Sequence, residues 1–168
     1  MGASYTDTIN VDFRRMASML EDAAEQYCQK MAERGADLVR QQLTRGRPMV
    51  GSWEPLSPAT KEITGASKPY QTRTGSLMAS VFARKRGDLA WEFGISHPAV
   101  LAFEFGWAYE RTVKQSIYLY YLYGVTWAPH VSVFLPPRPI IKPATQWLER
   151  EQPQWYEHYI GNLVRLAM

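Results

Sequence analysis

The residue types that most often carry catalysis or metal binding are few in this sequence and widely spaced. The three histidines, His97, His130 and His158, lie far apart, and no HExxH or CxxC spacing occurs. This pattern predicts no zinc site. The single cysteine, Cys28, falls mid-helix among charged neighbours, with no sign of a base that would activate its thiol. The sequence therefore indicates neither a metal centre nor a nucleophilic thiol.

Two carboxylates, Glu92 and Glu104, could form an acid pair of the kind that hydrolyses glycosides. Nothing in their spacing brings them together, and a solvated strand position explains Glu92 more simply. The sequence also lacks a GxSxG elbow and a glycine-rich phosphate loop. We expect a protein without enzymatic activity or cofactor. A small hydrolase that depends on Glu104 or His97 is retained as one rival hypothesis.

Three consecutive cations, Arg84, Lys85 and Arg86, stand at the turn of a predicted hairpin. One interpretation is simply a charged, well-solvated turn. The other is that these side chains face phosphates, for example DNA in a channel, where a ring of subunits would multiply a modest affinity per subunit. A net charge of only +3 is small for a dedicated duplex-DNA binder. A nucleic-acid-binding accessory protein is retained as the second rival hypothesis.

Length and composition indicate one globular domain over residues 1–168. The chain is 46% hydrophobic and 13% aromatic, with six Trp and ten Tyr. Aromatics in such number favour either a large core or an interface, where they are common anchors. The longest apolar run, residues 117–123, is far too short to cross a bilayer. We expect a soluble protein made in a cytoplasm, with no membrane partner.

Hydrophobic periodicity predicts an α+β fold, in which a long N-terminal helix and a C-terminal helix pack on a mainly antiparallel sheet. Apolar residues at three- and four-residue spacing predict a helix over 11–44, with Gly35 marking a close packing contact. Alternation over 80–96 predicts a hairpin. Short helices are predicted from Ser57 and Thr74, and a helical turn over 98–105. Strands are predicted over 116–123 and 131–135, followed by a rigid extended segment over 136–143 that contains four prolines. The last predicted element is a helix from 144 to 168 with a kink at Pro153.

The stretch 116–123 is apolar or aromatic on both alternating faces, unlike a strand with one wet face. Left exposed, such a segment would promote aggregation, so it must be covered. The cover is either this chain's own helices or another chain. Because a phenol has a polar tip, Tyr118, Tyr120 and Tyr121 favour an interface over a dry core.

Four segments, in order, resemble the phage virion-morphogenesis family of the phage Mu tail-completion type, which is related to siphophage neck proteins. Residues 51–61 (GSWEPLSPATK) look like its W-x-P-L-S-x-x-T motif, and 73–80 (RTGSLMAS) look like T-G-x-L-x-x-S. Residues 102–106 (AFEFG) look like its EFG step, and 135–144 (LPPRPIIKPA) look like P-x-R-P-F-L-x-P-A. The stretch 107–134 is longer and more aromatic than the connection expected of the family, and Ile140 stands where Phe is more frequent.

The resemblance implies a structural protein of a tailed-phage particle, in the neck or at the end of the tail. It implies a ring of six or twelve copies, assembled in the bacterial cytoplasm between connector or head-closure and tail-terminator or tail-tube proteins, with genomic DNA passing through. Trp53, Leu56 and Arg138 lie in its motifs and are candidate interface residues. Trp53 and Leu56 are apolar anchors of a polar loop. Arg138, between prolines, suits a fixed salt bridge or a partner carboxylate, and the alternative is an internal latch to the first helix.

Overall fold

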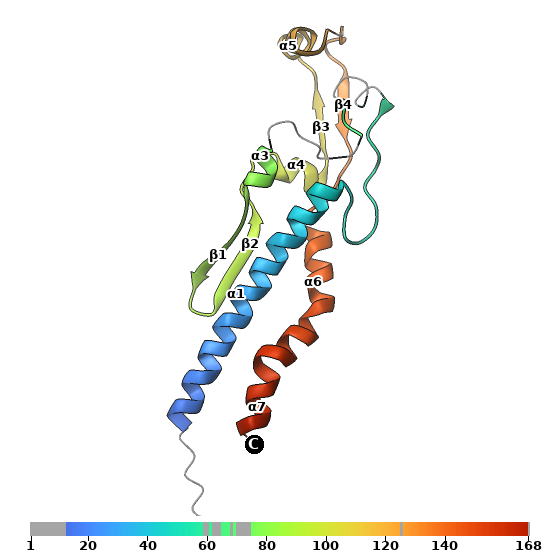
Figure 1. Cartoon of the computed structure of the whole chain (residues 1–168). Helices are drawn as coiled ribbons and strands as arrows, with labels where there is room; N and C mark the ends of the chain where they lie inside the picture. The colour runs from blue at the N-terminus through green and yellow to red at the C-terminus, as the bar shows by residue number, and fades with distance from the viewer. Residues whose placement is uncertain are drawn as a thin grey trace, which may run out of the picture.

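The computed structural model describes residues 13–58, 61, 65–67, 69, 75–124 and 126–167. The fold is α+β, as predicted (Figure 1). The chain runs through α1 (Phe13–Arg45), α3 (Ser76–Ala79), β1 (Val81–Gly87), β2 (Ala90–Ile95), α4 (Val100–Phe105), β3 (Trp107–Glu110), α5 (Val113–Tyr123), β4 (Ser132–Leu135), α6 (Ile141–Tyr156), a π-helical turn (Glu157–Gly161) and α7 (Asn162–Ala167).

The molecule is elongated along α1, and it divides into a body and an arm (Figure 1). In the body, α6 and α7 run beside α1, while the β1–β2 hairpin packs on α1 from another side. The arm is the β3–β4 ribbon with α5 at its far end, and it extends beyond the C-terminal end of α1. The body therefore holds the packed layers, and the arm projects from it.

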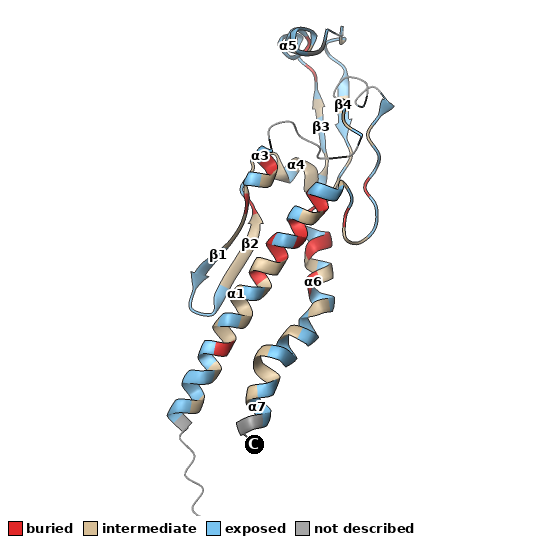
Figure 2. Ribbon diagram, in the orientation of Figure 1, coloured by how far each residue is buried: buried red, intermediate tan, exposed pale blue. Residues whose placement is uncertain are grey.

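The core lies along the C-terminal half of α1 and the start of α6 (Figure 2). Ala32, Ala36, Val39 and Leu43 recur at four- and three-residue spacing and form the buried stripe of α1. This stripe confirms the predicted helix, which ends one residue later than expected. Ala36, Val39 and Leu43 belong to one core cluster with residues from the rest of the body: Leu77, Val81, Ile95, Ile140, Ala144 and Leu148.

The β1–β2 hairpin is confirmed, in antiparallel register with Val81 opposite Ile95 and Ala83 opposite Phe93. The ring of Phe93 reaches α1 at Gly35, as the predicted close contact requires. A Cβ atom at Gly35 would lie 2.5 Å from Cδ1 of Phe93, so a larger residue would push the hairpin off the helix. Gly35 thus sets how closely the two elements approach.

The strand predicted over 116–123 is wrong, because these residues belong to helix α5. Local capping explains the difference. Thr112 and Gln115 form a capping box, in which each side chain accepts from the other residue's backbone N–H. Gly124 closes the helix in the left-handed region at φ 68°. A short apolar run has no decisive period, and these caps select the helix.

The remaining predictions are confirmed in part. The strand over 131–135 is β4, and its partner β3 was not predicted. The helical turn before Gly106 is α4. The final helix starts at Ile141 and not at 144, so the predicted extended segment is wrong for its last three residues. Pro143 lies in the first turn of the helix, where its missing N–H costs nothing, and is therefore compatible with an earlier start. Pro153 lies inside α6, and a π-helical turn comes after it. The helix expected from Ser57 falls mostly outside the described residues, as does Thr74, while α3 has Gly75 as its N-cap.

An ion pair between Arg34 and Glu151 ties α1 to α6. Arg34 donates to Glu151 through Nε at 2.8 Å and Nη2 at 2.7 Å, and Trp147 Nε1 donates to the same carboxylate at 2.7 Å. The hydrogen bond from Arg34 lowers the pKa of Glu151 from its usual value, with a smaller contribution from Trp147. Both partners are mostly shielded, so the pair is expected to contribute more than a surface ion pair.

This pair makes part of the stability depend on pH. Because the folded-state pKa of Glu151 is depressed, its stabilisation is full above the unfolded value of about 4.3 and is lost as the pH falls through the folded value. We predict that Glu151→Gln lowers the free energy of unfolding by about 1.5 kcal/mol at neutral pH, and by progressively less below about pH 4. Urea denaturation across this range measures the effect. Glu149→Gln, at an exposed position, is the control, and a loss independent of pH would contradict the assignment.

Candidate interaction surface

The segment 137–141 is held by side chains that come from three distant parts of the chain. Trp53 Nε1 donates to the carbonyl of Pro139 at 2.7 Å. Arg138 in turn donates to the loop that carries Trp53, from Nε to the carbonyl of Glu54 at 2.9 Å and from Nη2 to that of Pro55 at 3.2 Å. The loop and the proline-rich segment therefore hold each other in place.

Two further side chains fix the start of α6. One oxygen of Glu104, Oε1, accepts the backbone N–H groups of Ile140 and Ile141, both at 2.6 Å. A carboxylate there satisfies free N–H groups and favours the positive end of the helix. Gln42 is fully buried, donates to the carbonyl of Ile140 at 2.9 Å, and accepts the backbone N–H of Met49 at 3.1 Å. We call this set of contacts the junction.

Three of the four motifs contribute a residue to the junction: Trp53, Glu104 and Arg138. Arg138 makes an internal latch, although to the loop at 54–55 instead of the first helix. Trp53 is 9% exposed and belongs to the core cluster together with Leu77, from the second motif. Leu56 is half-buried. An interface role for Trp53, Leu56 and Arg138 stays a prediction.

The arm carries little packing of its own. Its ribbon pairs Trp107 with Leu135 and Glu110 with Ser132, and a two-stranded ribbon alone is marginally stable. At the base of α5 the guanidinium of Arg111 lies 4.7 Å from the ring centre of Trp127. Three buried polar atoms there have no hydrogen-bond partner in the described structure: Arg111 Nε, Ser116 Oγ and Trp127 Nε1. The arm is thus weakly stabilised by internal contacts.

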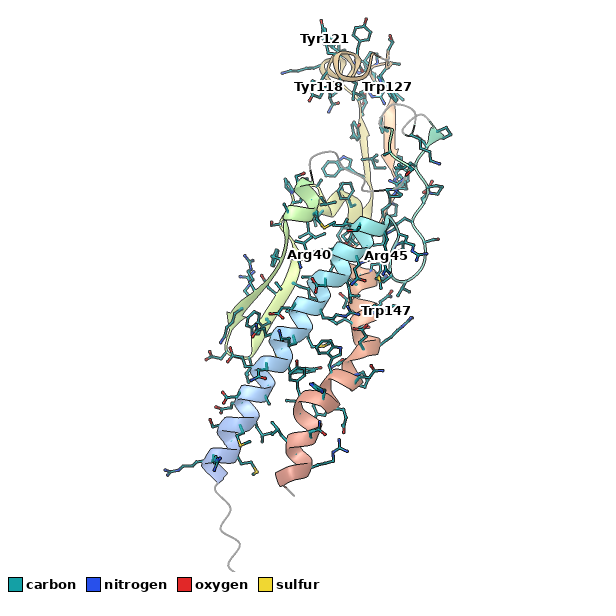
Figure 3. All side chains as sticks on the ribbon, in the orientation of Figure 1. Arg40, Arg45, Tyr118, Tyr121, Trp127 and Trp147 are labelled. Atoms are coloured by element: carbon teal, nitrogen blue, oxygen red, sulfur yellow. The ribbon has the colours of Figure 1, made fainter. Side chains whose placement is uncertain are left out.

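The tip of the arm exposes five apolar side chains of one short helix, Ile117, Tyr118, Tyr120, Tyr121 and Leu122 of α5, which we call the tip patch. Tyr118 and Tyr121 are labelled at the end of the arm in Figure 3. The exposed fraction is 62% for Tyr118, 51% for Tyr120 and 80% for Tyr121. All three predicted interface tyrosines therefore lie together on one short helix at the end of a projection. Contiguous apolar surface of this kind marks interaction sites in many proteins.

The basic cluster lies beside the hairpin turn, with its charges engaged within the chain. Glu92 accepts from Arg86 at 2.7 Å and from Arg84 at 2.6 Å, and Lys85 pairs with Glu25 of α1. Hydrogen bonds, from Arg86 first and then Arg84, lower the pKa of Glu92. A role of these three cations toward DNA stays a prediction.

The residues considered for catalysis have separate structural partners. Glu92 binds the hairpin arginines, whereas Glu104 caps α6. His97 Nδ1 accepts the backbone N–H of Ala99, and His130 Nδ1 lies 3.0 Å from Glu110 Oε1. Among the described residues there is no cluster of three His, Cys, Asp or Glu side chains suited to a metal ion. Nor does the described part of the chain contain a helix long and apolar enough to cross a membrane.

Sequence reasoning singled out Trp53, Glu104 and Arg138, although not for the contacts they make in the junction, and it missed Gln42 and Arg111. Gln42 and Arg111 are polar residues that become buried only through contacts with distant segments, which leave no local signal. The capping box of Thr112 and Gln115, followed by Gly124, was a local signal that could have revealed α5. Comparisons with protein-family models, with curated proteins and with solved structures found no match.

The junction predicts different sensitivities for a motif position and a hairpin position. We predict that Trp53→Ala lowers the free energy of unfolding by about 3–5 kcal/mol, because a buried ring and its hydrogen bond are lost. Arg84→Ala should change it by about 0.5 kcal/mol or less, since the side chain is exposed. Denaturant unfolding of both variants gives the comparison. Equal losses would contradict the role of Trp53.

The tip patch predicts a separation between folding and assembly. We expect Tyr120→Ser with Tyr121→Ser to leave the free energy of unfolding within about 0.5 kcal/mol of the unmodified chain, because both rings are exposed. Self-association or incorporation into particles should be lost. Val164→Ser, an exposed apolar position on α7, is the matched control and should assemble normally. Cooperative unfolding of the double variant at a much lower temperature would mean that the tip is part of the folded core.

Proposed function

We propose that this protein is a structural subunit of a tailed-phage particle, working in the neck or at tail completion as one member of a ring. Its task would be to join the head connector to the tail, or to terminate the tail so that it can be joined. The observation that carries the proposal is the tip patch, an apolar helix held out on a ribbon where this chain's own core does not cover it.

An exposed apolar helix of this kind is unfavourable in water unless a partner covers it. The body has its own core and does not need the arm to bury its apolar residues. The arm is therefore better explained by binding than by folding. A ring subunit needs such a surface, because it must contact its neighbours and the proteins above and below it.

The four motifs that resemble the virion-morphogenesis family support the phage setting. Those around Trp53, Glu104 and Arg138 form the junction, which gives a physical reason for these residue types to occur together. In this proposal the ring has six or twelve copies and lies against connector or head-closure and tail proteins. Genomic DNA would pass through its lumen with non-specific contact only.

A nucleic-acid-binding accessory protein is the second candidate, favoured only by the Arg84–Lys85–Arg86 cluster. Each of these cations already pairs with a carboxylate of this chain, which reduces the positive field available to phosphates. Strong, salt-sensitive binding of DNA by the isolated monomer would favour this candidate over the ring.

Oligomeric state tests the proposal directly. We predict that native mass spectrometry of the purified protein, or of intact necks that contain it, detects a closed ring of defined stoichiometry. Some rings form only on an assembled partner, so both preparations are needed. A strict monomer in both settings would overturn the proposed function.

A further inference from the structure

The body contains an apolar groove between α1, β2 and α6. It has a volume of about 350 Å³, and its walls include Tyr27, Met31, Leu89, Trp91, Phe93 and Leu148. Trp91 lines this groove, and its Nε1 is buried without a hydrogen-bond acceptor among the described residues. That atom is enclosed by the protein and is not reached from the groove. The lining is mainly apolar, so the groove is suited to an apolar occupant.

The tip patch is an apolar surface that could occupy such a groove. At 100° per residue, its five side chains cover about 200° of the circumference of α5, leaving mainly the side of Ser116 turned inward. A helix that is apolar around most of its surface needs a concave partner more than a flat one. Tyr118 and Tyr121, the two most exposed members, lie on one stripe with Lys114 at spacings of four and three.

The volume of the groove also fits side chains of the tip patch. An apolar cavity of about 150 Å³ holds one benzene ring, so the groove has room for two aromatic rings. Charge is complementary as well: Lys114 on α5 and Glu149 at the groove are both exposed, and neither forms an ion pair within the described residues.

The two surfaces of one copy are too far apart to meet. The helical rise places Met31, in the groove, about 20 Å from the end of α1 at Arg45. The β3–β4 ribbon adds about 13 Å beyond that end before α5 is reached. In Figure 1, α5 lies beyond the end of α1 while the groove residues lie beside its middle. The groove can therefore receive α5 only from a second copy.

We infer that the arm of each copy docks into the groove of the next, with Tyr118 and Tyr121 in the groove and Lys114 facing Glu149. The two surfaces are different, so the contact is heterologous and repeats from copy to copy. It closes into a ring if the rotation allows, or continues as a filament. The inference deepens the proposed ring and rests on it, because it identifies the surfaces through which neighbouring subunits join.

Cross-linking of mixed variants tests this contact. Two proteins are made in a Cys28→Ser background, one with Val113→Cys in the first turn of α5 and one with Gln152→Cys at the groove. Val113 is exposed and lies next to Lys114, so both tyrosines of the contact are kept. Treatment of the mixture with a short bismaleimide should give a cross-linked dimer that contains both variants. The variant carrying both substitutions should give a ladder beyond the dimer. Arg45→Cys, exposed at the end of α1, replaces Gln152→Cys as the matched control and should give no product with Val113→Cys.

Three results would overturn the inference: no mixed product, a product from Val113→Cys alone, or equal reaction with Arg45→Cys. The second would mean that tips pair with tips and give a dimer, not a ring. Absence of the mixed product while the unmodified chain still forms rings would reject the groove and leave the proposed function standing. A strict monomer in solution and in particles would reject both.

A charge exchange gives an independent check. Lys114→Glu and Glu149→Lys should each weaken association by about two- to fivefold, as expected for an exposed ion pair. The two changes together should restore it, as measured by sedimentation equilibrium at low salt. Failure of the double variant to recover would contradict the pairing of these two residues.

Discussion

The structure depends on the hydrogen bonds that the backbone N–H and C=O groups of Pro139–Ile141 make. Ile140 is fully buried and its two neighbours are half-buried, and backbone N–H and C=O groups shielded from water must find partners. The partners here are side chains distant in the sequence: Trp53 for the carbonyl of Pro139, Gln42 for that of Ile140, and Glu104 for two N–H groups. Without them α6 could not begin where it does, and the face of α6 that covers α1 would lose its position.

The same contacts hold the root of the arm. β3 begins directly after Gly106, which has φ 76° and a backbone so close to Leu135 that a Cβ atom would lie 2.9 Å from its carbonyl oxygen. β4 ends at Leu135, just before the segment held by the junction. Both strands therefore leave the body from a tightly packed point, whereas the tip has few contacts. A firmly held root reduces the conformational entropy that the arm would lose on binding.

This division gives the two halves of the molecule different roles. The body is stabilised by the stripe of α1, the hairpin and α6, including the ion pair of Arg34 with Glu151. The arm contributes apolar surface that the body does not cover. The motifs that resemble the phage family fall mainly at the point where the two halves meet. In a ring subunit this arrangement would let one surface adapt to its neighbour while the body keeps a common fold.

Features with a local signal could be predicted from the residues alone. The period of α1, the alternation of the hairpin and the Gly and Pro breaks placed most elements, and three exposed tyrosines were recognised as a group. Whether residues 116–123 form a strand or a helix could not be predicted in this way, because a short run that is apolar throughout fits both. The burial or engagement of Gln42, Glu104 and Arg111 emerged only in the folded chain, since their partners lie many residues away. The place of the tyrosines on a projecting arm emerged there too, because exposure depends on which segments pack together and not on residue type alone.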